Sequence, residues 1–167
     1  MKFLPAENLT FKTHLKPEEV IRRLADNIEP EKVFRLGIFN RNETKAYEGY
    51  ILGTTFNIKR ITSYRNSFLP KINGTIEGEY GRTTIKVKMR LQLLVIVFLC
   101  IWCGGVGTGA IVFLTEAFNK SAFNVESFIP FGMLLFAYVL TMTAFKFESN
   151  RSKNDLKEIF EAEISNE

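Results

Sequence analysis

The hydrophobic positions of this chain are concentrated in two long runs without charged side chains. Residues 91–114, LQLLVIVFLCIWCGGVGTGAIVFL, form the first run of 24 residues, and residues 128–145, FIPFGMLLFAYVLTMTAF, form a second run of 18. A helix of 24 residues reaches about 36 Å, which is enough to cross a hydrocarbon core of about 30 Å. Because charges are costly inside lipid, both runs predict membrane-spanning helices, joined as a hairpin by the polar residues 115–127.

Residues 1–90 carry the shorter patterns of a small α+β domain. Lys16–Ile28 predicts a helix, because Pro17 suits the first turn and apolar residues recur at helical spacing. Runs of β-forming residues separated by turn formers predict strands at Leu9–Thr13, Val33–Phe39, Tyr47–Leu52, Thr55–Ile61, Ile72–Glu77 and Thr83–Arg90. Short connections favour antiparallel pairing, so we expect a small antiparallel sheet of five or six strands with one helix, ahead of the transmembrane hairpin.

The residues after the second run predict a further helix. Asn154–Ser165 places Leu156, Ile159, Phe160 and Ile164 in one apolar stripe. This C-terminal amphipathic helix is acidic, and the N-terminal domain is basic, so we expect the helix to dock on that domain. The expected organisation is therefore a cytoplasmic α+β domain at residues 1–90, a transmembrane hairpin at 91–146 and a cytoplasmic C-terminal helix at 147–167.

Charge is distributed unevenly along the chain and predicts the orientation. Residues 1–90 hold 17 Lys and Arg against 10 Asp and Glu. The loop between the predicted spans holds only Lys120, whereas the inner flanks of the spans hold eight cations: Arg82, Lys86, Lys88, Arg90, Lys146, Arg151, Lys153 and Lys157. By the positive-inside rule both termini are expected in the cytoplasm, with the loop outside.

Four of these cations, at the inner ends of the spans, are the candidates for binding acidic lipid headgroups: Lys86, Lys88, Arg90 and Lys146. Each basic side chain near an anionic membrane surface contributes about 1 kcal/mol of binding free energy. Generic positive-inside topology explains the same residues without a specific site. Nucleic acid is not expected as a partner, because the charge excess is modest and no nucleic-acid-binding motif accompanies it.

The first predicted span contains both cysteines and a glycine cluster. Cys100 and Cys103 form C-x-x-C, but an apolar membrane setting raises the pKa of a thiol, so packing is favoured over redox or metal chemistry. Gly105 and Gly109 are four residues apart on one helix face and allow another backbone to approach closely. Small residues of the second span, among them Ala137 and Thr141, are the favoured partner for this face, and a second copy of the chain is the alternative.

The stretch Tyr64–Pro70, YRNSFLP, is the most unusual part of the soluble region. Tyr64 and Arg65 combine an amphipathic ring with a planar donor fork, so Tyr64, Arg65, Asn66 and Ser67 are candidate ligand-binding residues. Structural roles, such as an ion pair of Arg65 or a turn held by Asn66, explain the residues equally well. The single histidine, His14, has no second ligand or nucleophile to form a metal site or a triad, so no catalytic residue, metal or cofactor is expected.

Several blocks resemble a group of small uncharacterised bacterial membrane proteins that have two spans. The blocks are FKTHLKPEEVIRRL (11–24), YRNSFLP (64–70), IKVKMRL (85–91), IPFGMLLF (129–136) and FKFES (145–149). This resemblance extends over nearly the whole chain and implies a bacterial source and a shared architecture, without an activity.

The expected protein is an integral plasma-membrane protein whose cytoplasmic domain binds lipid, a small ligand or a protein at the membrane surface. An accessory subunit that docks through the glycine face of the first span is one alternative. A membrane-associated enzyme that uses the Tyr64–Ser67 region is the other.

Overall fold

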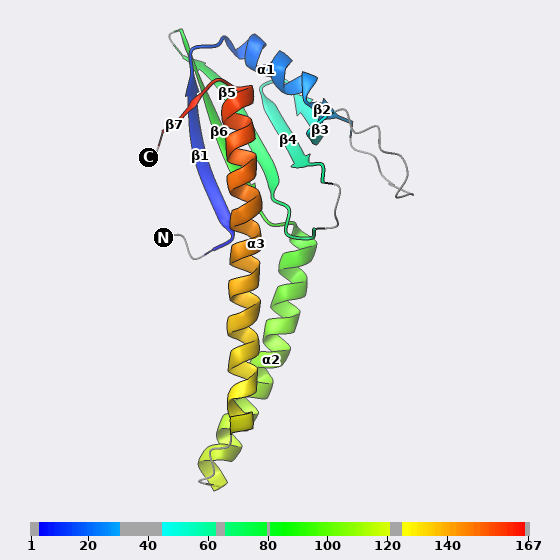
Figure 1. Cartoon of the computed structure of the whole chain (residues 1–167), viewed down its shortest axis with the longest axis vertical. Coiled ribbons are helices and arrows are strands. Elements are labelled where there is room, and N and C mark those ends of the chain that lie inside the picture. The colour runs from blue at the N-terminus through cyan, green and yellow to red at the C-terminus, as the bar shows by residue number, and fades with distance from the viewer. Residues whose placement is uncertain (1–3, 31–44, 63–65, 80, 121–124, 166–167) are drawn as a thin grey trace.

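The computed structural model describes residues 4–30, 45–62, 66–79, 81–120 and 125–165. Figure 1 shows an elongated molecule with a sheet at one end and two long helices that extend from it. In chain order the elements are β1 (Ala6–Thr13), α1 (Pro17–Asp26), β2 (Ile28–Glu29), β3 (Tyr47–Leu52), β4 (Thr55–Arg60), β5 (Lys71–Glu79), β6 (Arg82–Arg90), α2 (Leu93–Lys120), the 3-10 helix η1 (Val125–Phe128), α3 (Ile129–Ile159) and β7 (Glu163–Ser165).

The sheet has seven described strands in the order β2-β3-β4-β5-β6-β1-β7. All neighbouring pairs are antiparallel except β2 and β3, which run parallel, so the all-antiparallel sheet predicted from the sequence is corrected to a mixed one. The difference arises after α1, where Ile28 and Glu29 form a short strand instead of continuing the helix. The predicted strand Val33–Phe39 lies outside the described residues.

Strand β6 shows most clearly why the chain folds as a two-faced sheet. Its residues alternate between buried and outward-facing positions, with Ile85, Val87 and Met89 buried at 0–1% exposure and the intervening lysines exposed. This alternation is the expected period of two for a strand with one solvated face. We call the face with Ile85, Val87 and Met89 the inner face and the opposite one the outer face.

The inner face is covered by α1 and by the C-terminal half of α3 (Figure 1). Val20 and Leu24 of α1 and Leu156 of α3 are fully buried in the same core as the strand residues. The Phe160 ring, just after α3, contacts Phe11 edge-on with ring centres 5.8 Å apart and Phe56 at 6.2 Å. Burial of this apolar surface is the main source of stability for the sheet, at about 25 cal/mol per Å².

Helix α3 is the largest departure from the sequence prediction. The second predicted span and the predicted C-terminal helix form one helix of 31 residues, Ile129–Ile159, and the end of the predicted helix is instead strand β7 beside β1. The helix is uninterrupted because no Gly or Pro occurs between Met133 and Ile159. Its burial confirms the expected contact between the C-terminal segment and the N-terminal domain.

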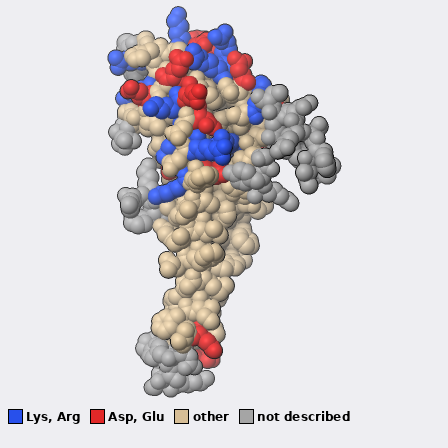
Figure 2. Space-filling view, viewed as in Figure 1, with Lys and Arg blue, Asp and Glu red and all other residues tan. Residues whose placement is uncertain are grey.

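Within the described part of the chain, two helices are long and apolar enough to cross a membrane. The candidate segments are Leu93–Glu116, with a mean hydropathy of 2.2, and Ile129–Ile159, with 1.5 over its most apolar window. Only 11% of the most apolar stretch of the first segment and 22% of that of the second are buried, whereas the core helix of a water-soluble protein would be mostly buried. Figure 2 shows the same division, since charged side chains cover the sheet end and the middle of the hairpin carries none in this view.

The sheet and the hairpin share one core. Leu91, between β6 and α2, Val95 in the first turn of α2 and Phe145 of α3 are buried in the same hydrophobic cluster as the sheet residues. Only Leu91 and Gln92 separate β6 from α2, and α3 enters the sheet region without a break. The orientation of the sheet relative to the hairpin is therefore fixed by the two-residue link between β6 and α2, by the continuity of α3 and by the shared packing. Below, the strands, α1 and the part of α3 after Phe145 are called the head.

Candidate functional site

The outer face of the sheet carries a group of cations close to the hairpin. Arg90 ends β6 and lies directly opposite Lys71, the first residue of β5. Lys88 precedes Arg90 by two residues in β6, so it lies on the same face of the sheet, opposite Asn73. Lys71, Lys88 and Arg90 are all exposed and are called here the basic triad. Opposed residues in antiparallel strands have Cα atoms about 5 Å apart, and residues two apart along a strand about 7 Å, so the three cations surround one small area.

The cations next to the basic triad have acidic partners. Lys59 lies opposite Lys71 in the neighbouring strand and pairs with Glu48, with Nζ and Oε1 3.2 Å apart. Lys86 pairs with Glu77 at 2.8 Å. Among the described residues the three members of the basic triad have neither an ion pair nor a side-chain hydrogen bond. Among the described residues, the positive charge of the outer face is therefore left without acidic partners at the basic triad.

The four predicted headgroup-binding residues do not form one cluster. Lys88 and Arg90 belong to the basic triad, whereas Lys86 is occupied by its pair with Glu77. Lys146 is exposed on α3, which packs on the inner face, so it lies on the other side of the sheet. Sequence reasoning missed Lys71, because only the register of β5 against β6 shows that it faces Arg90.

A polar strip holds α3 against the sheet between its apolar contacts. The Ser149 hydroxyl donates to the Glu7 carboxylate at 3.0 Å and lies 3.3 Å from the sulfur of Met89. The Lys153 ammonium forms an ion pair with the same carboxylate. Glu7, Ser149 and Lys153 are shielded from solvent, and such half-buried pairs hold a helix in register with its sheet.

Further along α3, Asp155 forms an ion pair with one strand and accepts a hydrogen bond from another. The Arg60 guanidinium lies 3.0 Å from its Oδ2, and the Tyr47 hydroxyl donates to the same oxygen at 3.4 Å. Tyr47 is fully buried, and this burial, together with the nearby Asp155 charge, raises the pKa of its hydroxyl well above the usual value. Tyr47 therefore stays neutral and acts as a hydrogen-bond donor at physiological pH.

Asn66 has a structural role in the described part of the Tyr64–Pro70 stretch. Its Nδ2 donates to Glu148 Oε1 at 3.0 Å, and its Oδ1 accepts from the backbone N–H of Phe68 at 2.9 Å. Glu148 is only 1% exposed, so Asn66 ties this connection to a buried carboxylate of α3. Ser67 is exposed in a turn, and Tyr64 and Arg65 lie outside the described residues.

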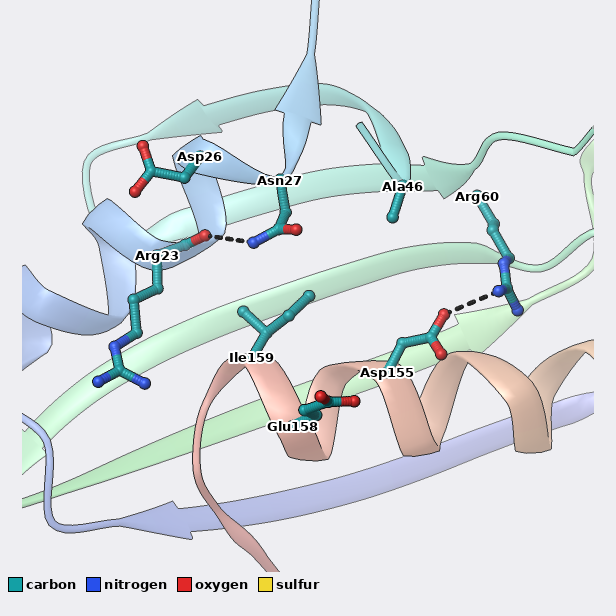
Figure 3. A pocket seen from close by; sticks show the side chains of 8 residues that line it. All are labelled: Arg23, Asp26, Asn27, Ala46, Arg60, Asp155, Glu158 and Ile159. Atoms are coloured by element: carbon teal, nitrogen blue, oxygen red, sulfur yellow. Dashed lines mark hydrogen bonds and ion pairs between the residues drawn. The ribbon is translucent and has the colours of Figure 1, made fainter. Parts of the chain in front are cut away.

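A cleft of about 650 Å³ opens between the end of α1, the strands β3 and β4, and α3 (Figure 3). Its lining side chains are Arg23, Asp26, Asn27, Ala46, Arg60, Asp155, Glu158 and Ile159. Its two arginines are already paired: Arg60 with Asp155, and Arg23 with Glu19 at 2.9 Å and Glu161 at 2.6 Å. The lining contains neither a histidine nor a cysteine, and both of its cations are already engaged by carboxylates.

The other candidate groups for chemistry lie apart from one another. Among the described residues no group of three or more His, Cys, Asp and Glu side chains has an arrangement that could hold a metal ion. His14 is exposed beyond the end of β1. Cys100 and Cys103 are both free thiols on α2.

The glycine face of α2 is not covered by α3. A Cβ atom built at Gly105 or Gly109 would meet no heavy atom within 4 Å, so the predicted close approach of the second span at these glycines does not occur within one chain. The two helices contact each other through other positions, with Ala110 only 4% exposed and Thr141 only 6%, while Ala137 is half-buried.

Comparison of the chain with protein-family models, with curated protein sequences and with solved structures found no match. The class is therefore defined by the architecture alone, as an α+β head continuous with two apolar helices.

Proposed function

We propose that the chain is an integral membrane protein of the bacterial plasma membrane whose head is a non-catalytic binding module for acidic lipid headgroups. The observation that carries this proposal is the position of the basic triad: its cations lack partners among the described residues, and Arg90 is three residues before Leu93, the first residue of α2. Leu93 and Leu94 are 75% and 79% exposed, which suits contact with lipid tails.

The proposed orientation places both termini and the head in the cytoplasm. The cytoplasmic leaflet carries most anionic lipid and a negative surface potential, which attracts basic groups next to a span. Because β6 leads almost directly into α2 and α3 is continuous from the hairpin into the head, the end of the outer face next to α2 would be held near the membrane surface (Figure 1). Binding of lipid to it therefore requires little ordering of the protein.

The test of this function uses the full-length protein in nanodiscs. We expect its thermal unfolding midpoint to be higher in discs that contain phosphatidylglycerol than in discs of phosphatidylcholine alone, because a ligand that binds only the folded state stabilises it. The charge-reversal variant K88E/R90E should lose this difference. Equal midpoints of the unchanged protein in both discs, or its extraction from membranes by alkaline carbonate, would contradict the proposal.

The uncovered glycine face favours a second candidate function, an accessory subunit of a larger membrane complex. Gly104 and Gly105 are exposed, and no described residue approaches the glycines of α2 closely. A partner helix that packs there should co-purify in mild detergent and be lost in the variant Gly105→Leu, because small residues are required for close helix contact. A protein that purifies alone before the substitution would exclude this function.

A further inference from the structure

The basic triad differs from the rest of the outer face in its charge balance. Like charges directly opposite each other in a sheet are destabilising, and Arg90 and Lys71 form such a pair. The sheet contains acidic partners for the adjacent cations, Glu48 for Lys59 and Glu77 for Lys86, but none of the described acids reaches the triad. An arrangement of this kind is stabilised by an anion that lies between the three side chains.

One neutral donor borders the same area. Asn73 lies directly opposite Lys88, and its Oδ1 accepts a hydrogen bond of 2.7 Å from Nδ2 of Asn57. This bond fixes the orientation of the Asn73 amide, so that its Nδ2 remains available as a donor on the outer face. Together with two ammonium groups and a guanidinium fork, the site offers many donors and few acceptors, which is the pattern that binds phosphate oxygens.

The depth of the site in the membrane matches lipid phosphates. Arg90 and Leu93 are three residues apart, so the backbone separation is at most about 10 Å. The headgroup layer extends about 5–8 Å beyond the hydrocarbon core on each side of a bilayer. The long side chains of Arg90 and Lys71 therefore reach the level of the phosphates when Leu93 and Leu94 contact the lipid tails.

We infer that Lys71, Lys88, Arg90 and Asn73 form a site for the phosphomonoester headgroup of a membrane phospholipid, as in phosphatidic acid. This inference rests on the proposed function and adds the chemical class of the headgroup. A monoester phosphate has three terminal oxygens and a charge between −1 and −2, whereas a diester has two such oxygens and a single charge. Three unpaired cations and a fixed amide complement the monoester more completely.

The experiment places the full-length protein in nanodiscs of phosphatidylcholine with equal amounts of phosphatidic acid and phosphatidylglycerol, and counts retained lipids by native mass spectrometry. We expect about tenfold more phosphatidic acid than phosphatidylglycerol to be retained, since one further charge near three cations contributes about the 1.4 kcal/mol that corresponds to a factor of ten. Lowering the pH from about 8 to about 5.5 should reduce this ratio, because the second ionisation of a phosphomonoester occurs near pH 6.

A matched pair of variants separates the site from overall charge. K71Q/K88Q/R90Q removes the basic triad, and K12Q/K16Q/R82Q removes three exposed cations at the far end of the head. The first variant should retain both acidic lipids equally, and the second should keep the preference. Thermal unfolding in phosphatidylcholine discs shows whether each variant is folded. If the first variant does not fold, the single variant K71Q, which should lower the preference several-fold, takes its place.

The outcomes distinguish the two proposals. Equal retention of both acidic lipids above phosphatidylcholine would overturn the phosphomonoester site and leave the proposed function intact. Retention of neither acidic lipid would overturn both. Inorganic phosphate that displaces retained phosphatidic acid at equal concentration would show a site for free phosphate and overturn the assignment to a lipid; failure to displace it supports the lipid.

Discussion

At the scale of single residues, several side chains have roles that the structure makes specific. Asn66 binds Glu148 and a backbone N–H, so in this protein it is a structural residue that connects a turn to α3. Gly74 is required by a neighbour across the sheet, since a Cβ there would lie 2.1 Å from the ring of Phe56. Phe56 fills the space above the glycine and also contacts Phe160.

Tyr47 gives a pH-dependent prediction. Its pKa is raised in the folded state, so its contribution to stability is fully present below pH 10 and is lost as the pH rises through the folded-state pKa. Tyr47→Phe should reduce the free energy of unfolding at neutral pH by about 1 kcal/mol, because the hydrogen bond to Asp155 is lost. Denaturant unfolding across the alkaline range should show this deficit shrinking above pH 10. A constant difference at every pH would contradict the role given to burial.

At the scale of elements, α3 links the hairpin to the head. At about 1.5 Å per residue its 31 residues extend about 46 Å, well beyond the hydrocarbon thickness of about 30 Å. The residues that pack on the sheet, such as Ser149, Ser152 and Leu156, follow helical spacing that starts in the apolar segment. The rotational phase of α3 in the hairpin therefore fixes which of its side chains face the sheet.

An insertion tests this linkage. One alanine inserted between Phe147 and Glu148 rotates all later residues of α3 by about 100°, which turns Leu156 and Phe160 away from the inner face. We expect faster hydrogen exchange throughout β1 and β7, because both strands depend on this core. The same insertion after Glu126 precedes α3 and keeps its phase, so exchange in the head should be unchanged. Equal protection in both variants would exclude the linkage.

At the scale of the whole molecule, charged and apolar surface are separated along the long axis (Figure 2). The charged head lies at one end of the hairpin, and acidic side chains are visible near the other end (Figure 2). Glu116, near the end of α2, and Glu126, in η1, are both exposed. The positive-inside rule counts Lys and Arg, which are concentrated at the head end of the hairpin, and it therefore favours a cytoplasmic head.

Labelling of single cysteines measures the orientation. In a background with Cys100→Ala and Cys103→Ala, a membrane-impermeant maleimide should label Glu126→Cys in intact cells. It should label Lys12→Cys only after lysis, because Lys12 lies in the head. The reversed pattern would place the head outside, and labelling of both positions in intact cells would show that the hairpin does not span the membrane.

The local patterns of the sequence determined most of the elements. Period-two alternation in residues 83–90 identified β6 and its two faces, and the uncharged runs identified both apolar helices, because periodicity and hydropathy depend only on neighbouring residues. The triplet of cations at the end of β6 was visible in the same way. The structure places two of the residues predicted to bind headgroups, Lys88 and Arg90, in the basic triad.

The tertiary structure alone decided how distant segments meet. The register of β5 against β6 brings Lys71 opposite Arg90, and the continuity of α3 turns Glu148, Ser149 and Asp155 toward the sheet. The tertiary structure also leaves the space beside Gly105 and Gly109 open among the described residues. Register and helix phase depend on packing between segments that are distant in the chain, so no local pattern contains them. The three cations become neighbours only because the folded sheet places them on one face.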